Sequence, residues 1–194
     1  MAKGGQFERD IAKTLTKWVT GKERPYAFWR TPASGALMTV ANAVDVSGDI
    51  MAIRPEGRFL TEKFSFECKN GYPKANFHKH LKKIKNHEIE GFWEECIGDA
   101  RKADKHGILI WKKLGQPTII GFELIDANFL RSAFDRAYRL DLPAKTVTLG
   151  WGRGLPDIQF FNFKEFFETI PSESFKKVIR KLRPIRSIVN EDKH

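Results

Sequence analysis

Two charged residues in the segment Phe64-Ser65-Phe66-Glu67-Cys68-Lys69 have types and a spacing that suit metal-assisted chemistry. Because side chains alternate between the two faces of a β-strand, Glu67 and Lys69 would share one face with Ser65, and the other three would form an apolar face. A carboxylate can hold a hard divalent cation while a neighbouring ammonium orients a water molecule. An isolated Glu-x-Lys also occurs on strands whose outer face is simply charged, so both interpretations stay open.

Asp49 is a candidate second ligand for the same cation. Residues 48–53 and 59–70 are β-rich runs separated by turn-forming residues at 54–58. The pattern predicts a hairpin that places Asp49 opposite Glu67. Two adjacent carboxylates repel each other unless a cation or a lysine compensates them, so such a pair indicates a functional site. A Gly-Asp pair at the start of a strand is also consistent with simple turn chemistry.

The elements that must position these side chains can be read from hydrophobic spacing. Phe7, Ile11, Leu15 and Trp18 mark one face of an amphipathic helix over 6–19. Further helices are expected at 92–102, 127–138 and 174–182, and further strands at 24–30, 108–111, 118–124 and 145–151. This order predicts one α/β domain, with a core at about 3–125 and a C-terminal α+β extension at about 126–194.

Composition limits the class of protein. The 194 residues fit one domain, and 41% hydrophobic residues with 16 Phe and 5 Trp supply a globular core. A net charge of +10 favours a polyanion, with nucleic acid as the first expectation. Two cysteines are too few for a disulfide framework, so we expect a reducing compartment, the cytoplasm. The chain shows no signal-peptide pattern and no apolar run near the ~20 residues that span a bilayer, so we expect no membrane association.

Several segments, taken in order, resemble the motifs of one nuclease superfamily. Gly48-Asp49 followed by Glu67-Cys68-Lys69 is similar to the D…E-x-K signature of PD-(D/E)XK, restriction-endonuclease-like nucleases, with Gly48 in place of the usual proline. The start, Lys3-Gly4-Gly5-Gln6-Phe7-Glu8-Arg9, resembles the K-G-x-x-x-E-R helix of archaeal and phage Holliday junction resolvases. Arg30-Thr31-Pro32-Ala33-Ser34-Gly35 resembles their R-x-x-x-S-G segment. The resemblance implies a mixed β-sheet flanked by helices.

The resemblance also implies the roles of the site residues. The implied metal ligands, for Mg²⁺ with Mn²⁺ as a substitute, are Asp49, Glu67, Glu8 and the backbone carbonyl of Cys68. Lys69 would position the attacking water. The implied contacts to DNA phosphates are Arg9, Arg30 and, on a loop near the scissile bond, Ser34. Phosphodiester hydrolysis suits such a site because a cation neutralises developing charge and lowers the pKa of the water.

Two further features lie outside these motifs. Between Lys63 and Lys85 there are seven lysines and one acidic residue, so Lys79, Lys82 and Lys83 are candidate contacts to the DNA backbone, with a solvated helix face as the alternative. Residues 92–100 resemble the helix that follows E-x-K in many superfamily members. Glu95 stands where many relatives carry glutamine, and we interpret it as a solvated helix carboxylate.

The function that these features favour is a Mg²⁺-dependent DNA endonuclease of the Holliday junction resolvase type. Such an enzyme would act on branched DNA as a homodimer, in recombination and repair, in the cytoplasm of a prokaryotic or phage-infected cell. The alternatives are a sequence-specific restriction or homing endonuclease, a DNA repair nickase, and a non-catalytic DNA-binding module whose nuclease site is degenerate.

Overall fold

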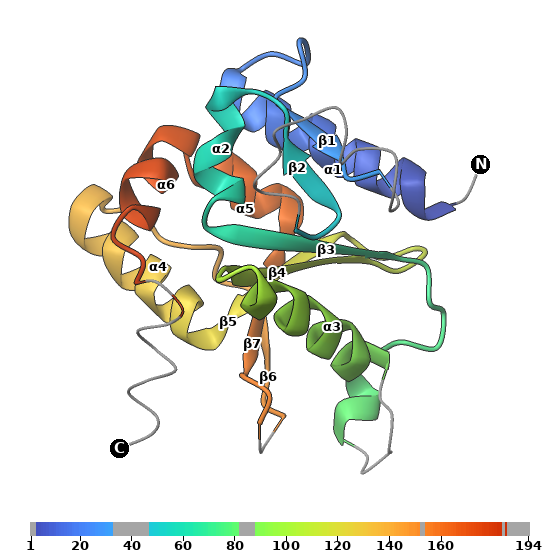
Figure 1. The fold of residues 1–194 in the computed structure, drawn as a ribbon. Coiled ribbons are helices and arrows are strands. Elements are labelled where there is room, and N and C mark those ends of the chain that lie inside the picture. The colour runs from blue at the N-terminus through green and yellow to red at the C-terminus, as the bar shows by residue number, and fades with distance from the viewer. Residues whose placement is uncertain (1–2, 33–46, 82–87, 152–153, 184, 186–194) are drawn as a thin grey trace.

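The computed structural model describes residues 3–32, 47–81, 88–151, 154–183 and 185 of the chain (Figure 1). The helices are α1 (Lys3–Thr20), α2 (Pro55–Thr61), the 3₁₀ helix η1 (Phe77–Leu81), α3 (Glu88–Lys102), α4 (Leu124–Tyr138), α5 (Phe163–Thr169) and α6 (Ser172–Ile179). The strands are β1 (Phe28–Arg30), β2 (Ile50–Ala52), β3 (Phe64–Asn70), β4 (His106–Lys112), β5 (Ile119–Glu123), β6 (Thr146–Leu149) and β7 (Ile158–Asn162). This is the mixed α/β architecture that the sequence predicts.

Five strands form one sheet in the order β3-β4-β5-β7-β6. β3 and β4 are parallel, which requires a crossover connection, and the chain between them contains α3. The remaining neighbours in this sheet are antiparallel. β7 and β6 are the last two strands of this sheet, at the edge opposite β3. The short strands β1 and β2 form a separate antiparallel pair.

Both faces of the sheet are covered by apolar packing. Phe64, Phe66 and Cys68 of β3 belong to one buried cluster, with residues of α1, α4, α5 and α6. Leu109 and Trp111 of β4 belong to a second cluster, with residues of α3. Figure 1 shows α1 and α3 on opposite sides of β3. The strand that carries the candidate catalytic residues is therefore held from both sides.

The hairpin predicted between 48 and 70 is wrong. Pro55 begins helix α2, preceded by the extended residue Arg54, because proline is well tolerated at the first helical position. Gly57, which suggested a turn, instead allows close packing of α2, since a Cβ there would lie 2.8 Å from the ring of Phe28. The predicted second strand accordingly starts at Phe64 rather than at 59, and α2 joins β2 to β3 as a crossover.

Most other predicted elements are confirmed. The helices expected at 6–19, 92–102 and 127–138 correspond to α1, α3 and α4, and the strands expected at 108–111 and 118–124 are the adjacent strands β4 and β5. The basic helix expected at 174–182 is α6, which ends at Ile179. No helix in the described part of the chain combines the length and the apolar character that a bilayer crossing demands.

Candidate active site

Glu67 and Lys69 form a close ion pair on the predicted polar face of β3. Lys69 Nζ lies 2.7 Å from Glu67 Oε1, and the two side chains are 12% (Lys69) and 10% (Glu67) exposed. Phe66 and Cys68 point to the other face and are buried in the core. The alternation expected from the strand period is confirmed, although α3 covers the polar face, which is therefore not an open surface.

Asp49 lies beside these residues, as expected, but through a parallel backbone contact and not through the predicted hairpin. Its backbone N–H donates to the carbonyl of Phe66 at 2.6 Å, and its Oδ2 accepts a hydrogen bond from the backbone N–H of Cys68 at 2.8 Å. Gly48 forms an isolated parallel bridge with Phe66. The Asp49 carboxylate therefore meets β3 through a parallel contact at the outer edge of the five-stranded sheet.

Gly48 is required for this contact. Its φ is +74°, a conformation that proline cannot adopt and that other residues adopt at a cost. A Cβ at this position would lie 2.4 Å from the carbonyl oxygen of Phe66 and 2.8 Å from Ser65 Oγ. Glycine in place of the usual proline is thus explained by the close approach of the backbone to β3.

The acidic residues of the site have raised pKa values. Burial, and then repulsion from Asp49, raise the pKa of Glu67 to about 7, against the opposing effect of Lys69. Burial also raises the pKa of Asp49, although the hydrogen bond from Cys68 opposes this. For Lys69, burial alone would lower the pKa, but hydrogen bonds to Glu67 and Glu95 raise it. A bound cation would relieve the repulsion between the carboxylates.

Glu8 of α1 joins this cluster. Burial, and then repulsion from Asp49, raise the pKa of Glu8. Arg30 Nη1 lies 3.6 Å from Glu8 Oε2, so the predicted phosphate clamp faces the predicted third acid. Arg9 lies on the same helix and donates from Nη2 to Gln6 at 3.0 Å. α1 and β1 thus place an acid and a guanidinium next to Asp49.

Glu95 is the contact that sequence reasoning missed. Its side chain is 54% exposed, which agrees with a solvated helix position, yet its Oε2 lies 2.6 Å from Lys69 Nζ. Lys69 is therefore held between Glu67 on its own strand and Glu95 on α3. The signal in the sequence was the resemblance of residues 92–100 to the helix after E-x-K, which does not reveal which residue faces the lysine.

Three predicted DNA contacts, Ser34, Lys82 and Lys83, lie outside the described residues. Lys79 belongs to η1, where its backbone N–H donates to Asn76 Oδ1 at 3.2 Å. Within the part of the chain that the structure describes, no hydrogen bond or ion pair links the Lys79 side chain to the acidic cluster. The structure therefore brings together Glu8, Arg30, Asp49, Glu67 and Lys69.

The acidic cluster offers donors of the kind that a hard divalent cation prefers, although among the described residues only His106, Glu123 and Asp126 place three possible ligand atoms within 4.8 Å of one another. Asp49, Glu67 and Glu8 offer carboxylate oxygens, the donors that Mg²⁺ prefers, and the backbone of Cys68 adjoins two of them. Burial is the main cause of the raised pKa of all three carboxyl groups, and repulsion from Asp49 adds to it for Glu67 and Glu8. The donor types are those that the predicted metal site requires.

A second buried polar cluster lies at the opposite end of β4. His106 Nδ1 lies 2.8 Å from Asp126 Oδ2 and its Nε2 lies 2.9 Å from the carbonyl of Arg183. The hydrogen bond and charge of Asp126 raise the pKa of His106 against the effect of burial, which favours a charged ring that donates from both nitrogens. Glu123 completes the cluster and pairs with Arg101 at 2.7 Å. With both ring nitrogens engaged, this is an ionic network rather than a metal site.

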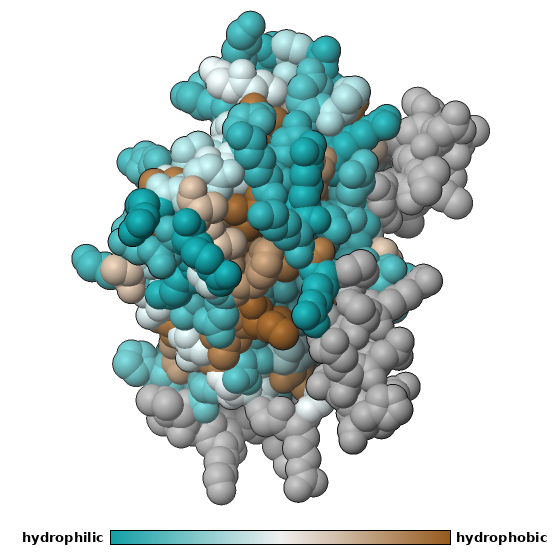
Figure 2. Space-filling model, turned by 90° about the vertical axis from the view of Figure 1, so that its left-hand side faces the viewer, coloured by the Kyte–Doolittle hydropathy of each residue, from teal (hydrophilic) through white to brown (hydrophobic). Residues whose placement is uncertain are grey.

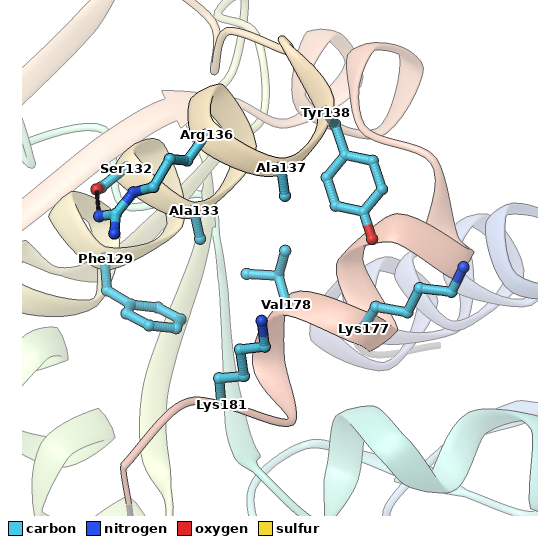
Figure 3. A pocket seen from close by; sticks show the side chains of 9 residues that line it. All are labelled: Phe129, Ser132, Ala133, Arg136, Ala137, Tyr138, Lys177, Val178 and Lys181. Carbon is cyan, nitrogen blue, oxygen red and sulfur yellow. Dashed lines mark hydrogen bonds between the residues drawn. The ribbon is translucent and has the colours of Figure 1, made fainter.

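A groove of about 560 Å³ between α4 and α6 does not overlap the acidic cluster. Its floor is apolar, and Arg136, Lys177 and Lys181 stand around it (Figure 3). Figure 2 shows this side of the molecule, with hydrophobic surface between hydrophilic side chains. In Figure 1 the two helices lie at the left, away from the end of β3 that carries Lys69. The groove is thus remote from the acidic cluster.

A mixed sheet covered by helices, whose edge strand carries Glu-x-Lys beside an aspartate, defines a nuclease of the PD-(D/E)XK class. The comparison with known families leads to the same class. The family described as phage putative PDDEXK endonuclease matches residues 1–177, and the chain belongs to this family. Comparisons with curated proteins and with solved structures give no match.

Proposed function

We propose that the chain is a Mg²⁺-dependent endodeoxyribonuclease that cuts branched DNA in the manner of a Holliday junction resolvase. The observation that carries the metal-dependent part is the 2.7 Å contact between Lys69 and Glu67, next to an Asp49 carboxylate anchored on Cys68. A carboxylate pair and an ammonium in one half-buried cluster are the groups that metal-assisted hydrolysis requires. Mn²⁺, which accepts the same oxygen ligands, is expected to replace Mg²⁺.

The residues of the cluster take distinct roles in this proposal. Asp49, Glu67 and Glu8 would hold the cation, with the carbonyl of Cys68 as a further oxygen donor. When bound, the cation supplies positive charge to the phosphate and lowers the pKa of a water ligand. Lys69 orients the attacking water through its N–H donors, and its two carboxylate partners keep the ammonium in place.

Positive charge outside the cluster supports DNA as the substrate. Arg30, beside Glu8, and Arg9 on α1 present guanidinium groups that suit phosphate oxygens. The net charge of +10 would attract the backbone of any DNA, since each neutralised phosphate releases counterions. These contacts position a duplex and do not read its sequence.

The preference for branched DNA and the homodimer form the finer part of the proposal. A four-way junction has approximate two-fold symmetry, and its resolution requires two matched cuts, which an isologous dimer would supply from two identical sites. The motifs shared with Holliday junction resolvases and the phage family of the chain support this part. The process would be recombination or repair in the cytoplasm of a prokaryotic or phage-infected cell.

A cleavage panel tests the proposal. Four-way junctions, nicked, single-stranded and linear DNA would be incubated with Mg²⁺, with Mn²⁺ and with EDTA. We expect cleavage only with the metals and fastest cleavage of the junction. Glu67→Ala and Lys69→Ala should each abolish cleavage but retain DNA binding. Glu62→Ala, which removes an exposed carboxylate just before β3, is the matched control and should cut normally.

Each outcome decides a separate part of the proposal. Cleavage that survives in EDTA or in Glu67→Ala would remove the metal mechanism. Equal cutting of all branched and linear substrates would remove the structure selectivity, and cutting at one defined sequence would favour a restriction or homing endonuclease. A monomeric mass in light scattering with bound junction would remove the dimer.

A further inference from the structure

One row of side chains crosses three strands at the level of Lys69. The register pairs Lys69 of β3 with Trp111 of β4, and Trp111 with Ile119 of β5. Paired residues point to the same face of a sheet, and neighbouring strands lie ~4.8 Å apart. Trp111 is therefore one strand, and Ile119 two strands, away from the lysine of the active site.

Aromatic contacts follow the same path. Lys69 Nζ lies 5.7 Å from the ring centre of Phe92, and Phe92 lies 6.4 Å from Trp111. Trp111 meets Phe77 of η1 edge to face at 5.6 Å. Tyr72, which is 42% exposed, packs edge to face on Phe92 at 4.6 Å. An aromatic cluster, in which Phe92 and Trp111 are buried, thus connects the active-site lysine to η1.

This row ends at a cavity of about 380 Å³ between η1 and the β4–β5 connection. Phe77, Trp111 and Ile119 contribute its apolar wall, and its polar lining residues are Asn76, His78, Lys113 and Gln116. Lys113 is held at the cavity by a 2.9 Å hydrogen bond to the carbonyl of Ala75. The cavity therefore combines an apolar, partly aromatic wall with a cation.

These features suit a nucleobase that has left its stack. The partly exposed ring of Phe77 can stack on a base, the amide of Asn76 can pair with the base edge, and Lys113 can meet the adjoining phosphate. The distance between Lys69 and the cavity indicates which base of the DNA strand this would be. Nucleotides in a stacked strand are ~3.4 Å apart, so a cavity ~5–10 Å from β3 lies about one to three nucleotides from the scissile phosphate.

We propose that this cavity receives a base extruded from the DNA strand next to the scissile phosphate, so that the enzyme prefers DNA with an unpaired or mismatched base there. Extrusion costs least where pairing is already lost, as in a mismatch or at a branch point. The inference rests on the proposed function, because the DNA strand that is cut beside Lys69 would bring the base to the cavity. An unpaired base would then be the feature of branched DNA that the enzyme recognises.

The test measures binding without cleavage. Fluorescence anisotropy in Ca²⁺ would compare the Kd of a matched short duplex with that of duplexes in which one mismatch is moved along the strand. We expect at least one mismatch position to be bound about tenfold more tightly than matched DNA. Gln116→Trp, which fills the cavity from an exposed position, should reduce this ratio to about one and leave the Kd for matched DNA within about twofold.

Two further variants make the result specific. His78→Trp fills the same cavity from the opposite wall and should have the same effect as Gln116→Trp. The test therefore does not depend on the folding of a single variant. Ala137→Trp, which introduces the same indole into the α4–α6 groove, should keep the full mismatch preference (Figure 3). Equal affinity of the parent for all duplexes, or a preference that survives both cavity-filling variants, would overturn the inference.

The failure of this inference differs from the failure of the proposed function. A mismatch preference in Ca²⁺ without cleavage in Mg²⁺ would keep the base cavity and remove the nuclease activity. Cleavage of junctions without any mismatch preference would keep the nuclease and remove the cavity as a base site. An absence of all DNA binding would remove both.

Discussion

The backbone N–H of Cys68 holds the carboxylate of Asp49 at 2.8 Å, although the two residues belong to segments that do not form a hairpin. This hydrogen bond orients Asp49 towards the site and favours its charged form, against the burial that raises its pKa. It depends on the close approach of Gly48 to Phe66, so the geometry of the acidic pair depends on a residue without a side chain.

Gly48→Ala should therefore damage both folding and activity. The substitution adds a Cβ in contact with β3 at a positive φ, and we expect a loss of about 3 kcal/mol or more in the free energy of unfolding, with cleavage reduced at least about 100-fold. Gly115→Ala is the matched control, because Gly115 has φ +73° but no neighbour within 4 Å of the added atom. It should cost about 1 kcal/mol and leave cleavage intact. Urea unfolding and cleavage rates provide the comparison, and equal effects of the two variants would contradict a role for the contact with β3.

Glu95→Gln tests whether the second carboxylate positions Lys69. The variant keeps a hydrogen-bond acceptor at 2.6 Å but removes its charge, so one charge-assisted bond weakens. We expect kcat to fall about tenfold, equivalent to about 1.4 kcal/mol, with little change in KM.

The neighbouring exposed residue provides the control for this effect. Glu94→Gln removes the same charge from α3 and should leave kcat unchanged. Identical kinetics for the two variants would show that Glu95 does not act on the lysine.

His106→Gln tests the buried ionic network. Burial disfavours the charged ring, but the hydrogen bond and charge of Asp126 raise the pKa of His106 above 6.5. The folded state therefore binds this proton more tightly than the unfolded chain, and the resulting stability is present below pH ~6.5 and lost as pH rises through the folded pKa. At pH 6 the variant should lose about 3 kcal/mol in the free energy of unfolding.

The pH dependence separates a charged His106 from a neutral one. The stability gap between parent and His106→Gln should narrow as the pH is raised above about 6.5 and through the raised pKa of the folded state, as measured by urea unfolding. His78→Gln, at an exposed position, is the control and should lose little stability at pH 6. A gap of constant size across this range would argue that His106 is neutral in the folded protein.

Charge reversal at Lys82 and Lys83 tests the basic segment after β3. Lys82→Glu with Lys83→Glu should weaken binding to all DNA sequences and flatten the slope of log affinity against log salt by about 0.9 for each phosphate that the variant no longer neutralises. Lys177→Glu with Lys181→Glu changes the same charge at the remote α4–α6 groove and should have a smaller effect on the slope. An unchanged slope in the first variant would show that this segment does not meet the DNA backbone.

The parts of the fold that sequence could predict are those set by local periodicity. The helical spacing of Phe7, Ile11 and Leu15 gives α1, and the alternation in 64–69 correctly separates Glu67 and Lys69 from the core. Pro55 and Gly57 were ambiguous, because both residues occur in turns as well as at a helix start and at a close helix contact. That ambiguity produced the wrong hairpin, although Asp49 does lie against β3 beside Glu67, through a parallel contact instead of an antiparallel one.

The contacts that sequence could not predict are tertiary. Glu95 meets Lys69 only because α3 packs across the polar face of β3, and no spacing within residues 92–100 shows which side chain will reach the lysine. His106 pairs with Asp126 and with the carbonyl of Arg183, 77 residues away, for the same reason. Local patterns identify which groups are available, whereas packing decides which of them meet.

Because the chain crosses over through α2, the number of residues between Asp49 and Glu67 does not determine where these two residues lie in the site. Because α2 lies outside the sheet, its length could change without moving Asp49 away from Glu67, provided that the bridge from Gly48 to Phe66 is kept. One residue inserted between Ser65 and Glu67 would instead turn the carboxylate into the core, since strand side chains alternate. Distant homologues of this chain should therefore tolerate insertions and deletions between the two acidic residues, but not within the strand itself.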